Sequence, residues 1–412
     1  MLDREYFFAI LIEALFPDRQ TGMPCNISEK NGTGPKKLGE ADWEEIVREL
    51  NQQTVLGVAS IVLKKKATEG IPVKLQEYVT MKRRKIVMRY MQMAVVQREI
   101  CQKLEGIGIP VAVMKGMAAA CYYPNPMLRM MGDIDLIVKP DEYEEALCVL
   151  RESGFVIDSK TNEYHIAVKR NDITIELHKS PASTHKDVHG DYIREFILSG
   201  LDAAEIGTAG MDHFPILPWK QNGMELIWHI RQHLYNGLGL RQIIDWMMFV
   251  DHCLDNQKYI EFEPALEKSG LKNLAITTTK MCQKYLGLRR EGISWCREAD
   301  EQLCDDLMDY ILEQGNFGIK KPDDKTAKIM SGYPNLGILL KELQRRGIEK
   351  WPAAEKRSFL KPFAWSYAIK QYIVTSKKKD PDLLSIIRNY KTARRRKKMF
   401  SKLYTLENRG DK

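Results

Sequence analysis

Several features that place proteins in large classes are missing from this sequence of 412 residues. It has no run of about eighteen apolar residues, so we expect no membrane span. Its eight cysteines show no Cys-x-x-Cys pair and no tight spacing, which favours a reducing cytoplasm over a disulfide framework. The apolar N-terminus lacks a positive start, because Asp3 and Glu5 outweigh Arg4, and Glu13 interrupts it. The N-terminus therefore predicts an amphipathic docking helix rather than a signal peptide.

The composition is that of an ordinary folded protein. Hydrophobic residues make up 44% of the chain, enough for two or three packed domains. There are 63 Lys and Arg against 55 Asp and Glu, a formal net charge of +8. This modest excess favours anionic partners such as nucleotides or RNA. We see no internal repeat.

The first 105 residues predict a helical region. We expect helices up to Pro17, from about Asp42 to Thr68 and from about Val73 to Glu105, with a Gly- and Pro-rich loop at residues 18–38. The third helix carries a basic cluster at residues 82–85, which we interpret as a solvated face. It also carries a Met-rich apolar stripe, which we interpret as core packing: Val87, Met88, Met91 and Val95.

Residues 106–215 predict a small mixed α/β core. Strands are expected at Ile109–Met114 and Asp133–Val138. A short helix is expected at Ala118–Tyr123 and a longer one at Pro140–Ser153. A hairpin is expected at residues 163–179, with its turn at Arg170-Asn171. Five helices follow in a domain at residues 216–318: Gly223–Tyr235, Leu240–Leu254, Tyr259–Lys268, Leu271–Leu286 and Ala299–Glu313. A C-terminal helical region with a basic tail fills residues 319–412. The predicted class is α+β, a mixed-sheet core flanked by helical regions.

Two aspartates separated by one residue begin the second strand. Alternate side chains of a strand share a face, so Asp133 and Asp135 point one way while Ile134 and Leu136 face the core. Two carboxylates this close repel each other unless a cation lies between them. Mg²⁺ favours one or two carboxylates together with phosphate oxygens. The pair therefore predicts a metal and nucleotide site.

Further candidates surround this pair. Glu176 and His178 share one face of the second hairpin strand, and a third carboxylate on a neighbouring strand can hold a metal or accept a proton. Lys115-Gly116 ends a strand and opens a helix, a turn that suits phosphate. Arg129 either bridges a phosphate, pairs with the acidic cluster or is a surface arginine.

The later helices offer two more pairs. Arg241 and Asp245 lie one helical turn apart and can form an ion pair, for which we favour a structural role at Asp245. Alternatively, they border the nucleotide or acceptor pocket. His229 and His233 have metal-ligand spacing, but Ile230 replaces the Glu of a zinc hydrolase motif, which argues against zinc. The basic tail, from Lys391 to Lys402, is interpreted as a solvated helix rather than a site for RNA.

These segments together resemble a known superfamily. The run Val113 to Gly116, then Tyr123-Pro124, then Arg129-Met-Met-Gly-Asp-Ile-Asp, resembles the DNA polymerase beta-type nucleotidyltransferases. It is more similar to their family of uncharacterised nucleotidyltransferases, which carries Lys-Gly where better-known members carry Gly-Ser or Gly-Gly. Ile175-Glu176-Leu177-His178 and the stretch from Trp228 to Asp245 are similar to later parts of that family's pattern.

The resemblance implies transfer of a nucleoside monophosphate from an NTP to an acceptor, with release of pyrophosphate. Asp133, Asp135 and Glu176 would be the catalytic residues and the ligands of Mg²⁺ or Mn²⁺. The other residues that it implies contact the nucleotide are Lys115, Gly116, Arg129, Gly132, His178 and Arg241. The acceptor would be a small molecule, a tRNA-like RNA end or a protein hydroxyl. Met117, where many members carry Ser or Gly, and a long Gly116–Asp133 gap depart from the pattern.

Two rival interpretations remain. A glycosyltransferase also uses Asp-x-Asp to bind a metal and a nucleotide sugar, but that function leaves Lys115-Gly116 and Glu176 unexplained. A catalytically silent nucleotide-binding or scaffold protein of the same fold would account for Met117.

Overall fold

The structure is a computed structural model that describes most of the chain. The described residues are 2–18, 38–66, 70–158, 164–181 and 188–320, with the shorter pieces 344, 347–348, 351, 357–364, 366–367 and 394–404. Those up to Lys320 belong to one compact unit, and those from Gln344 to Tyr404 belong to a second. The finer division into four regions stays a prediction.

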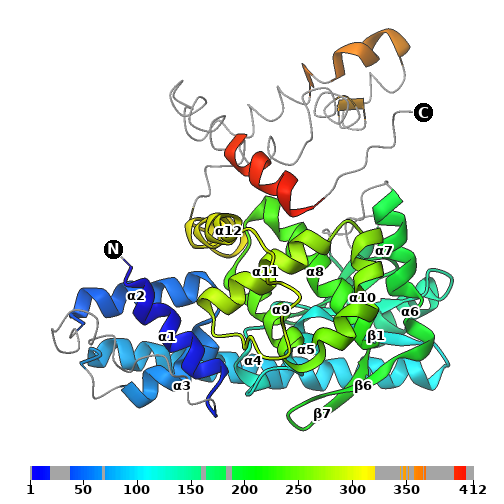
Figure 1. The fold of residues 1–412 in the computed structure, drawn as a ribbon. Helices are drawn as coiled ribbons and strands as arrows, with labels where there is room; N and C mark the ends of the chain where they lie inside the picture. The colour runs from blue at the N-terminus through cyan, green and yellow to red at the C-terminus, as the bar shows by residue number, and fades with distance from the viewer. Residues whose placement is uncertain are drawn as a thin grey trace. The chain divides into compact units, whose positions relative to one another are not determined.

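The first unit contains a mixed sheet of seven strands in the described part of the chain, of which Figure 1 labels β1, β6 and β7. Its spatial order is β3-β4-β5-β2-β1-β7-β6. The strands are β1 (Val111–Met114), β2 (Ile134–Val138), β3 (Val156–Ile157), β4 (His165–Arg170), β5 (Ile173–His178), β6 (Glu205–Ala209) and β7 (Asp212–Ile216). β2 pairs antiparallel with β1 and parallel with β5. The α+β class is therefore confirmed.

The predicted hairpin is present as β4 and β5, but its turn lies one residue later than expected. Arg170 pairs with Ile173, so the two turn residues are Asn171 and Asp172. Asn171 has φ 55°, the left-handed conformation that Asn tolerates better than most residues. The β6–β7 hairpin was not predicted. It joins the sheet through a parallel contact between Val113 and Ile216.

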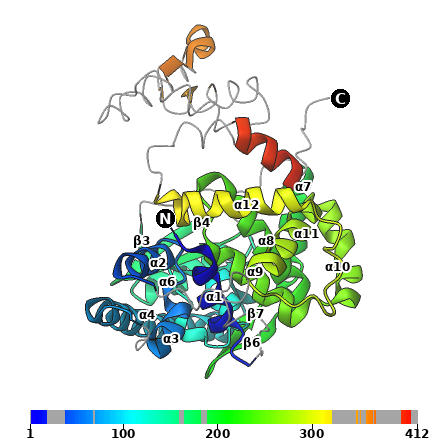
Figure 2. The same cartoon turned by 60° about the vertical axis from the view of Figure 1, so that its left-hand side comes forward.

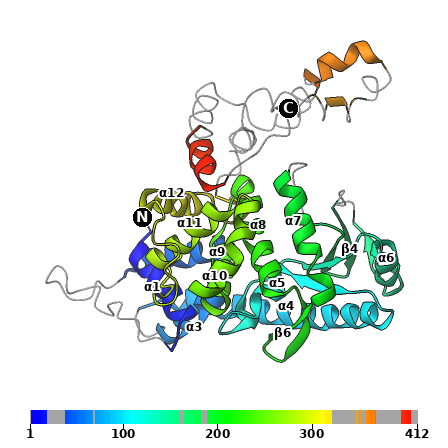
Figure 3. The same ribbon diagram turned by 45° about the vertical axis from the view of Figure 1, so that its right-hand side comes forward.

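The two faces of the sheet differ in chemistry. Val113, Leu136 and Leu177 point to one face and pack with helices α4 (Val73–Gly106) and α6 (Tyr143–Glu152) in the hydrophobic core. The alternate residues point the other way. We call this second side the polar face and define it by Asp135, Glu176, His165 and His178. Figure 3 shows α4 along one side of the sheet and α8 (Trp219–Asn236) on the other.

The described residues of the first unit also contain further helices. They are α1 (Arg4–Leu15), α2 (Glu40–Gln52), α3 (Leu56–Lys65), α5 (Lys115–Ala120), α7 (Val188–Leu198), α9 (Leu240–Cys253), α10 (Asn256–Lys268), α11 (Lys272–Tyr285) and α12 (Glu301–Gln314). Helices α1 to α3 gather beside α4 (Figure 2). The five helices predicted after residue 216 are confirmed as α8 to α12, with bounds that differ by a few residues.

One predicted helix was wrong, and another is displaced. The helix expected from Asp42 to Thr68 is broken into α2 and α3, because Thr54 has φ 57°, which an α-helix does not accept. The short helix expected at Ala118–Tyr123 is α5, which begins at Lys115 and ends at Ala120. Most of the predicted loop at 18–38 lies outside the described residues.

The core-packing interpretation of the Met-rich stripe on α4 was wrong. Met88, Met91 and Val95 are 59%, 57% and 60% exposed. The core side of α4 is instead formed by Tyr90, Met93 and their neighbours one turn apart. Residues i and i+2 of an α-helix are rotated by about 200° around the helix axis. Met88 therefore points away from the side that carries Tyr90. The basic residues Arg84 and Lys85 are exposed, as expected of a solvated face.

Two other expectations concern the whole chain. No helix in the described ranges is both long enough and apolar enough to cross a membrane. The seven cysteines among the described residues are all free. In the second unit, residues 394–403 are helical, with Arg394, Arg395, Lys398 and Lys402 exposed, whereas Lys391 lies outside the described residues.

Candidate active site

The three predicted carboxylates meet at one end of β2. Asp135 pairs in register with Glu176 of the parallel neighbour β5, and Asp133 directly precedes the strand. Ile134 and Leu136 are buried in the core, as predicted. Burial and the negative charges of Asp135 and Glu176 raise the pKa of Asp133 to about 6. A divalent cation that prefers oxygen ligands would relieve this repulsion, so the donor set fits Mg²⁺.

Lys115 lies among these carboxylates. Its Nζ is 3.1 Å from Asp135 Oδ1 and 3.8 Å from Glu225 Oε1. Burial lowers the pKa of Lys115, but the surrounding carboxylates outweigh it, and the net pKa is raised. Burial raises the pKa of Asp135, but the charges of Lys115 and His178 outweigh it and hold that pKa low. Lys115 and Asp135 therefore form a charged, buried pair.

The backbone at Lys115 is unusual. Its φ is 48°, in the left-handed region that costs a residue with a side chain about 1–2 kcal/mol. The resemblance aligns Lys115 with a glycine of better-known nucleotidyltransferases, and glycine takes this conformation freely. Gly116 follows and lies against the start of β2, since a Cβ added there would be 3.6 Å from the Asp133 carbonyl oxygen. The turn thus holds the lysine beside the carboxylates.

Arg129 is neither a surface arginine nor a partner of the three carboxylates. It is 3% exposed, and its Nε and Nη2 donate to the two oxygens of Asp245, at 2.7 and 2.6 Å. The hydroxyl of Tyr123 donates to the same carboxylate, at 2.7 Å. Asp245 therefore binds Arg129 rather than Arg241, the partner that helical spacing predicted. This buried pair supports the structural role favoured for Asp245.

The other predicted nucleotide contacts surround the loop before Asp133. Arg241 donates from Nη1 to the Met130 carbonyl, at 2.9 Å. Arg89, which sequence reasoning missed, donates to the Gly132 carbonyl at 3.1 Å and to that of Asp172 at 2.9 Å. These bonds fix the loop that leads into Asp133. Whether Arg129, Gly132 and Arg241 contact a nucleotide stays a prediction.

His178 is completely buried beside the carboxylates. Its Nε2 is 3.0 Å from Asp135 Oδ1 and 3.5 Å from Glu176 Oε2. His165 of β4 lies opposite it in the hairpin register, with Nε2 3.6 Å from Glu176 Oε1. Sequence reasoning missed His165. The hairpin register would have revealed it, because a turn at Asn171-Asp172 pairs His165 with His178.

Helix α8 carries a second group of polar residues, Glu225, His229 and His233, which were not predicted to lie together as one group. Glu225 is fully buried, neither carboxylate oxygen has a hydrogen-bond partner, and burial raises its pKa to about 6. His229 and His233 face each other, with their Nε2 atoms 2.8 Å apart. Burial lowers the pKa of both, so both rings are neutral at pH 7. The i, i+4, i+8 spacing of these residues on one helix face was the signal that could have found Glu225.

The described sheet thus brings three carboxylates together at one end of β2. Residues 39–287 match the family model described as uncharacterised nucleotidyltransferase, and the chain belongs to that family. No curated protein matches the sequence.

Similar solved structures are distant. Two are of the antibiotic-resistance factor ANT(2'')-Ia, one in solution and one with adenylyl-2''-tobramycin, at 10% and 11% identity, each covering 43% of this chain with a TM-score of 0.32. They are covered over 92% and 97% of their own length. A third is an antigenic nucleotidyltransferase-like protein from Paracoccidioides brasiliensis, at 16% identity and a TM-score of 0.31, over 48% of this chain and 93% of its own.

Proposed function

We propose that this protein transfers a nucleoside monophosphate from an NTP to an acceptor in a metal-dependent reaction that releases pyrophosphate. The observation that supports this proposal is the register of Asp135 and Glu176 on parallel strands, with Asp133 one residue before β2. Three carboxylates from two neighbouring strands are a donor set for the divalent ions that accompany triphosphates.

In the proposed reaction, an acceptor hydroxyl oxygen forms a bond to the α-phosphorus. The bond from that phosphorus to the oxygen bridging to the β-phosphate breaks, and pyrophosphate carries away the electron pair. Asp133, Asp135 and Glu176 would hold Mg²⁺ or Mn²⁺, which when bound would neutralise phosphate charge and lower the pKa of the hydroxyl. Lys115 contributes a positive charge to the triphosphate. The hydroxyl proton leaves to a carboxylate or to water.

The electrostatics divide the roles among the carboxylates. Burial raises the pKa of Glu176, but His178 outweighs it, and the net pKa is lowered. A carboxylate that stays ionised suits a metal ligand better than a proton acceptor. Asp133, whose pKa is raised to about 6 by burial and by the charges of Asp135 and Glu176, gains most from the charge of a bound cation. We therefore assign Glu176 chiefly to metal binding.

The acceptor is a hydroxyl of a small molecule, of an RNA end or of a protein. An alternative of the same fold, a catalytically silent nucleotide-binding or scaffold protein, is favoured by one observation. The ammonium of Lys115 already lies 3.1 Å from Asp135 and neutralises part of the carboxylate cluster without a metal.

Calorimetric titration with a Mg²⁺-bound, non-hydrolysable NTP analogue tests the proposed donor site without knowledge of the acceptor. We expect the wild-type protein to bind it, and Asp133→Ala and Asp135→Ala to lose that binding. Nucleotide sugars should give no heat, which separates the proposal from a glycosyltransferase. Glu261→Ala, which removes an exposed partner of Lys220, serves as the matched control. Equal binding by wild type and both aspartate variants would contradict the proposed site.

A further inference from the structure

Glu176 lies between two imidazoles in a way that the proposed magnesium site does not use. Its Oε1 is 3.6 Å from His165 Nε2, and its Oε2 is 3.5 Å from His178 Nε2. One ligand atom from each of the three residues lies within 4.8 Å of the others. The two rings are adjacent, with centroids 4.7 Å apart.

These separations are too long for hydrogen bonds of normal strength, which end near about 3.2 Å for nitrogen and oxygen. They are close to the spacing of ligands around a metal ion. Bonds of about 2.0–2.2 Å in tetrahedral geometry place neighbouring ligand atoms roughly 3.4 Å apart. Each imidazole therefore has one oxygen of Glu176 at ligand distance, Oε1 for His165 and Oε2 for His178.

The three residues are held by regular secondary structure. His165 of β4 pairs directly with His178 of β5, and Glu176 is two residues before His178 on the same face. The histidine side chains are 10% and 0% exposed, while the Glu176 side chain is 25% exposed. The site is thus rigid and shielded at the imidazoles, and it opens toward solvent at the carboxylate.

We propose that His165, Glu176 and His178 form a binding site for a first-row transition-metal ion such as Zn²⁺. Imidazole nitrogens suit such ions, whereas Mg²⁺ takes oxygen ligands. Three protein ligands leave a fourth position open, as in catalytic rather than structural zinc sites. Binding requires Nε2 of His178 without its proton, so the ion replaces the 3.0 Å contact of that nitrogen with Asp135.

The site differs from the proposed nucleotide site in its ligands, although the two share Glu176. Asp133 and Asp135 offer oxygen to a metal that accompanies the triphosphate, while the two imidazoles come from β4 and β5. An ion held there would fix the Glu176 carboxylate and add positive charge beside the acidic cluster. Such an ion could bind whether or not the protein transfers nucleotides.

Cobalt substitution tests the proposal on the full-length protein. After removal of metals with a chelator, Co²⁺ is titrated and its visible ligand-field absorption is recorded, with Zn²⁺ as the competitor. We expect one Co²⁺ per chain, an intense spectrum of low coordination number, and displacement by Zn²⁺ but not by millimolar Mg²⁺. His165→Ala should change the spectrum and weaken Co²⁺ binding by more than about tenfold. Loss of a residue that only supports a metal ligand already weakens binding by about 10–100-fold.

Two variants keep the result interpretable. His213→Ala removes an exposed histidine of β7 and should leave the Co²⁺ spectrum unchanged. Asp133→Ala should also retain it, which separates this site from the proposed nucleotide site. A Co²⁺ spectrum that is the same in wild type and His165→Ala, or no Co²⁺ bound by wild type, would overturn the inference and leave the proposed function standing. A His165-dependent spectrum in a protein that does not bind NTP would support the metal site and contradict the proposed function.

Discussion

Asp245 is buried between Arg129 and Tyr123 and accepts hydrogen bonds from both. Its carboxylate is 1% exposed, and the Arg129 guanidinium is 3% exposed. Removing one member of such a pair leaves the other charge buried without a counter-charge. This is more costly than losing a surface pair, which contributes only about 0–1 kcal/mol.

We therefore expect Asp245→Ala to lower the free energy of unfolding by about 3–5 kcal/mol. Urea denaturation followed by circular dichroism measures it. Glu261→Ala, which breaks the exposed pair with Lys220, is the matched control and should cost less than about 1 kcal/mol. A loss in Asp245→Ala no larger than in the control would contradict the structural role of Asp245.

Glu225 predicts a dependence of stability on pH. Burial raises its pKa from 4.5 to about 6, so the folded protein holds this proton more tightly than the unfolded chain does. The stabilisation from protonated Glu225 is complete below its unfolded pKa and is lost as the pH rises through about 6. The charged side chain then costs on the order of 2 kcal/mol at pH 7.

Glu225→Gln does not titrate, so its stability relative to wild type should increase as the pH is raised from about 5 to 7. The difference should approach about 2 kcal/mol. Urea unfolding of both proteins across that range measures it, with Glu261→Gln as the control for an exposed carboxylate. A difference that stays constant with pH would show that Glu225 is not buried in its ionised form.

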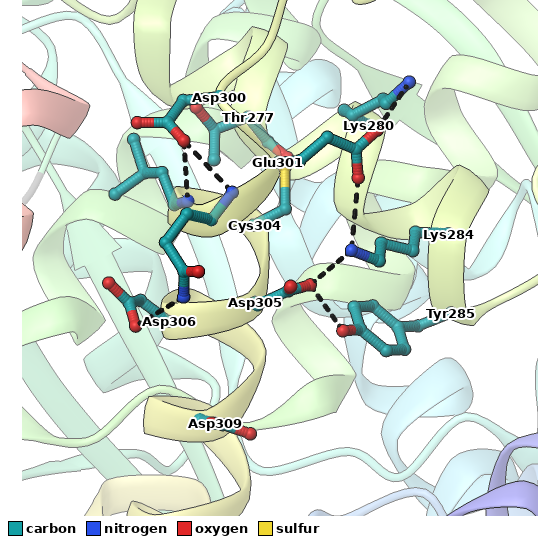
Figure 4. A network of polar contacts seen from close by, with 12 residues as sticks. Thr277, Lys280, Lys284, Tyr285, Asp300, Glu301, Cys304, Asp305, Asp306 and Asp309 are labelled. Atoms are coloured by element: carbon teal, nitrogen blue, oxygen red, sulfur yellow. Dashed lines mark hydrogen bonds and ion pairs between the residues drawn. The ribbon is translucent and has the colours of Figure 1, made fainter.

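At the scale of elements, α11 and α12 are joined by a network of ion pairs and hydrogen bonds (Figure 4). Lys284 Nζ lies 3.1 Å from Glu301 Oε2 and 2.6 Å from Asp305 Oδ1, and Tyr285 donates to Asp305 at 2.6 Å. These side chains are partly exposed, with 57% for Glu301 and 33% for Lys284. Water and salt screen such pairs.

Lys284→Ala should accordingly lower the free energy of unfolding by less than about 1 kcal/mol for each pair. Binding of the NTP analogue should not change, because the network touches none of the proposed site residues. Thermal unfolding and the calorimetric titration measure the two effects. A large loss of either stability or binding would indicate that the α11–α12 contact positions the site.

Elements differ in how far the sequence predicts them. Helices α8 to α12 follow from apolar periodicity that is local to each segment. The break between α2 and α3 depends on one residue, Thr54, whose left-handed φ no pattern of apolar residues indicates. The β6–β7 hairpin was missed because its strands are short and contain Pro215, and because β7 pairs with β1, about a hundred residues earlier. Met88 and Met91 were wrongly predicted to lie in the core, because hydrophobicity alone does not indicate which side of α4 packs against the sheet.

At the scale of the whole molecule, the part of the carboxylate site that depends on the local pattern of one strand could be predicted from the sequence. Strand alternation predicted the common face of Asp133 and Asp135, and parallel pairing of β2 with β5 brings Glu176 beside Asp135. The ion pair of Arg129 with Asp245 was not predicted, because Asp245 comes from α9 and helical spacing offered Arg241 as its partner instead. Glu225 meets Lys115 only because α8 covers the polar face. Contacts between distant segments depend on packing that a single sequence does not display.

We propose that the site around Asp133 and Asp135 transfers the nucleoside monophosphate, with the α-phosphate, from an NTP to an acceptor. The most direct measurement incubates the protein and Mg²⁺ with NTPs labelled either at the α- or at the γ-phosphate, in the presence of small-molecule, RNA and protein acceptor pools. We predict that only the α label becomes attached to an acceptor, that pyrophosphate is released in equal amount, and that Asp133→Ala and Asp135→Ala abolish both. Transfer of the γ label, or α-label transfer that survives in both variants, would contradict the account.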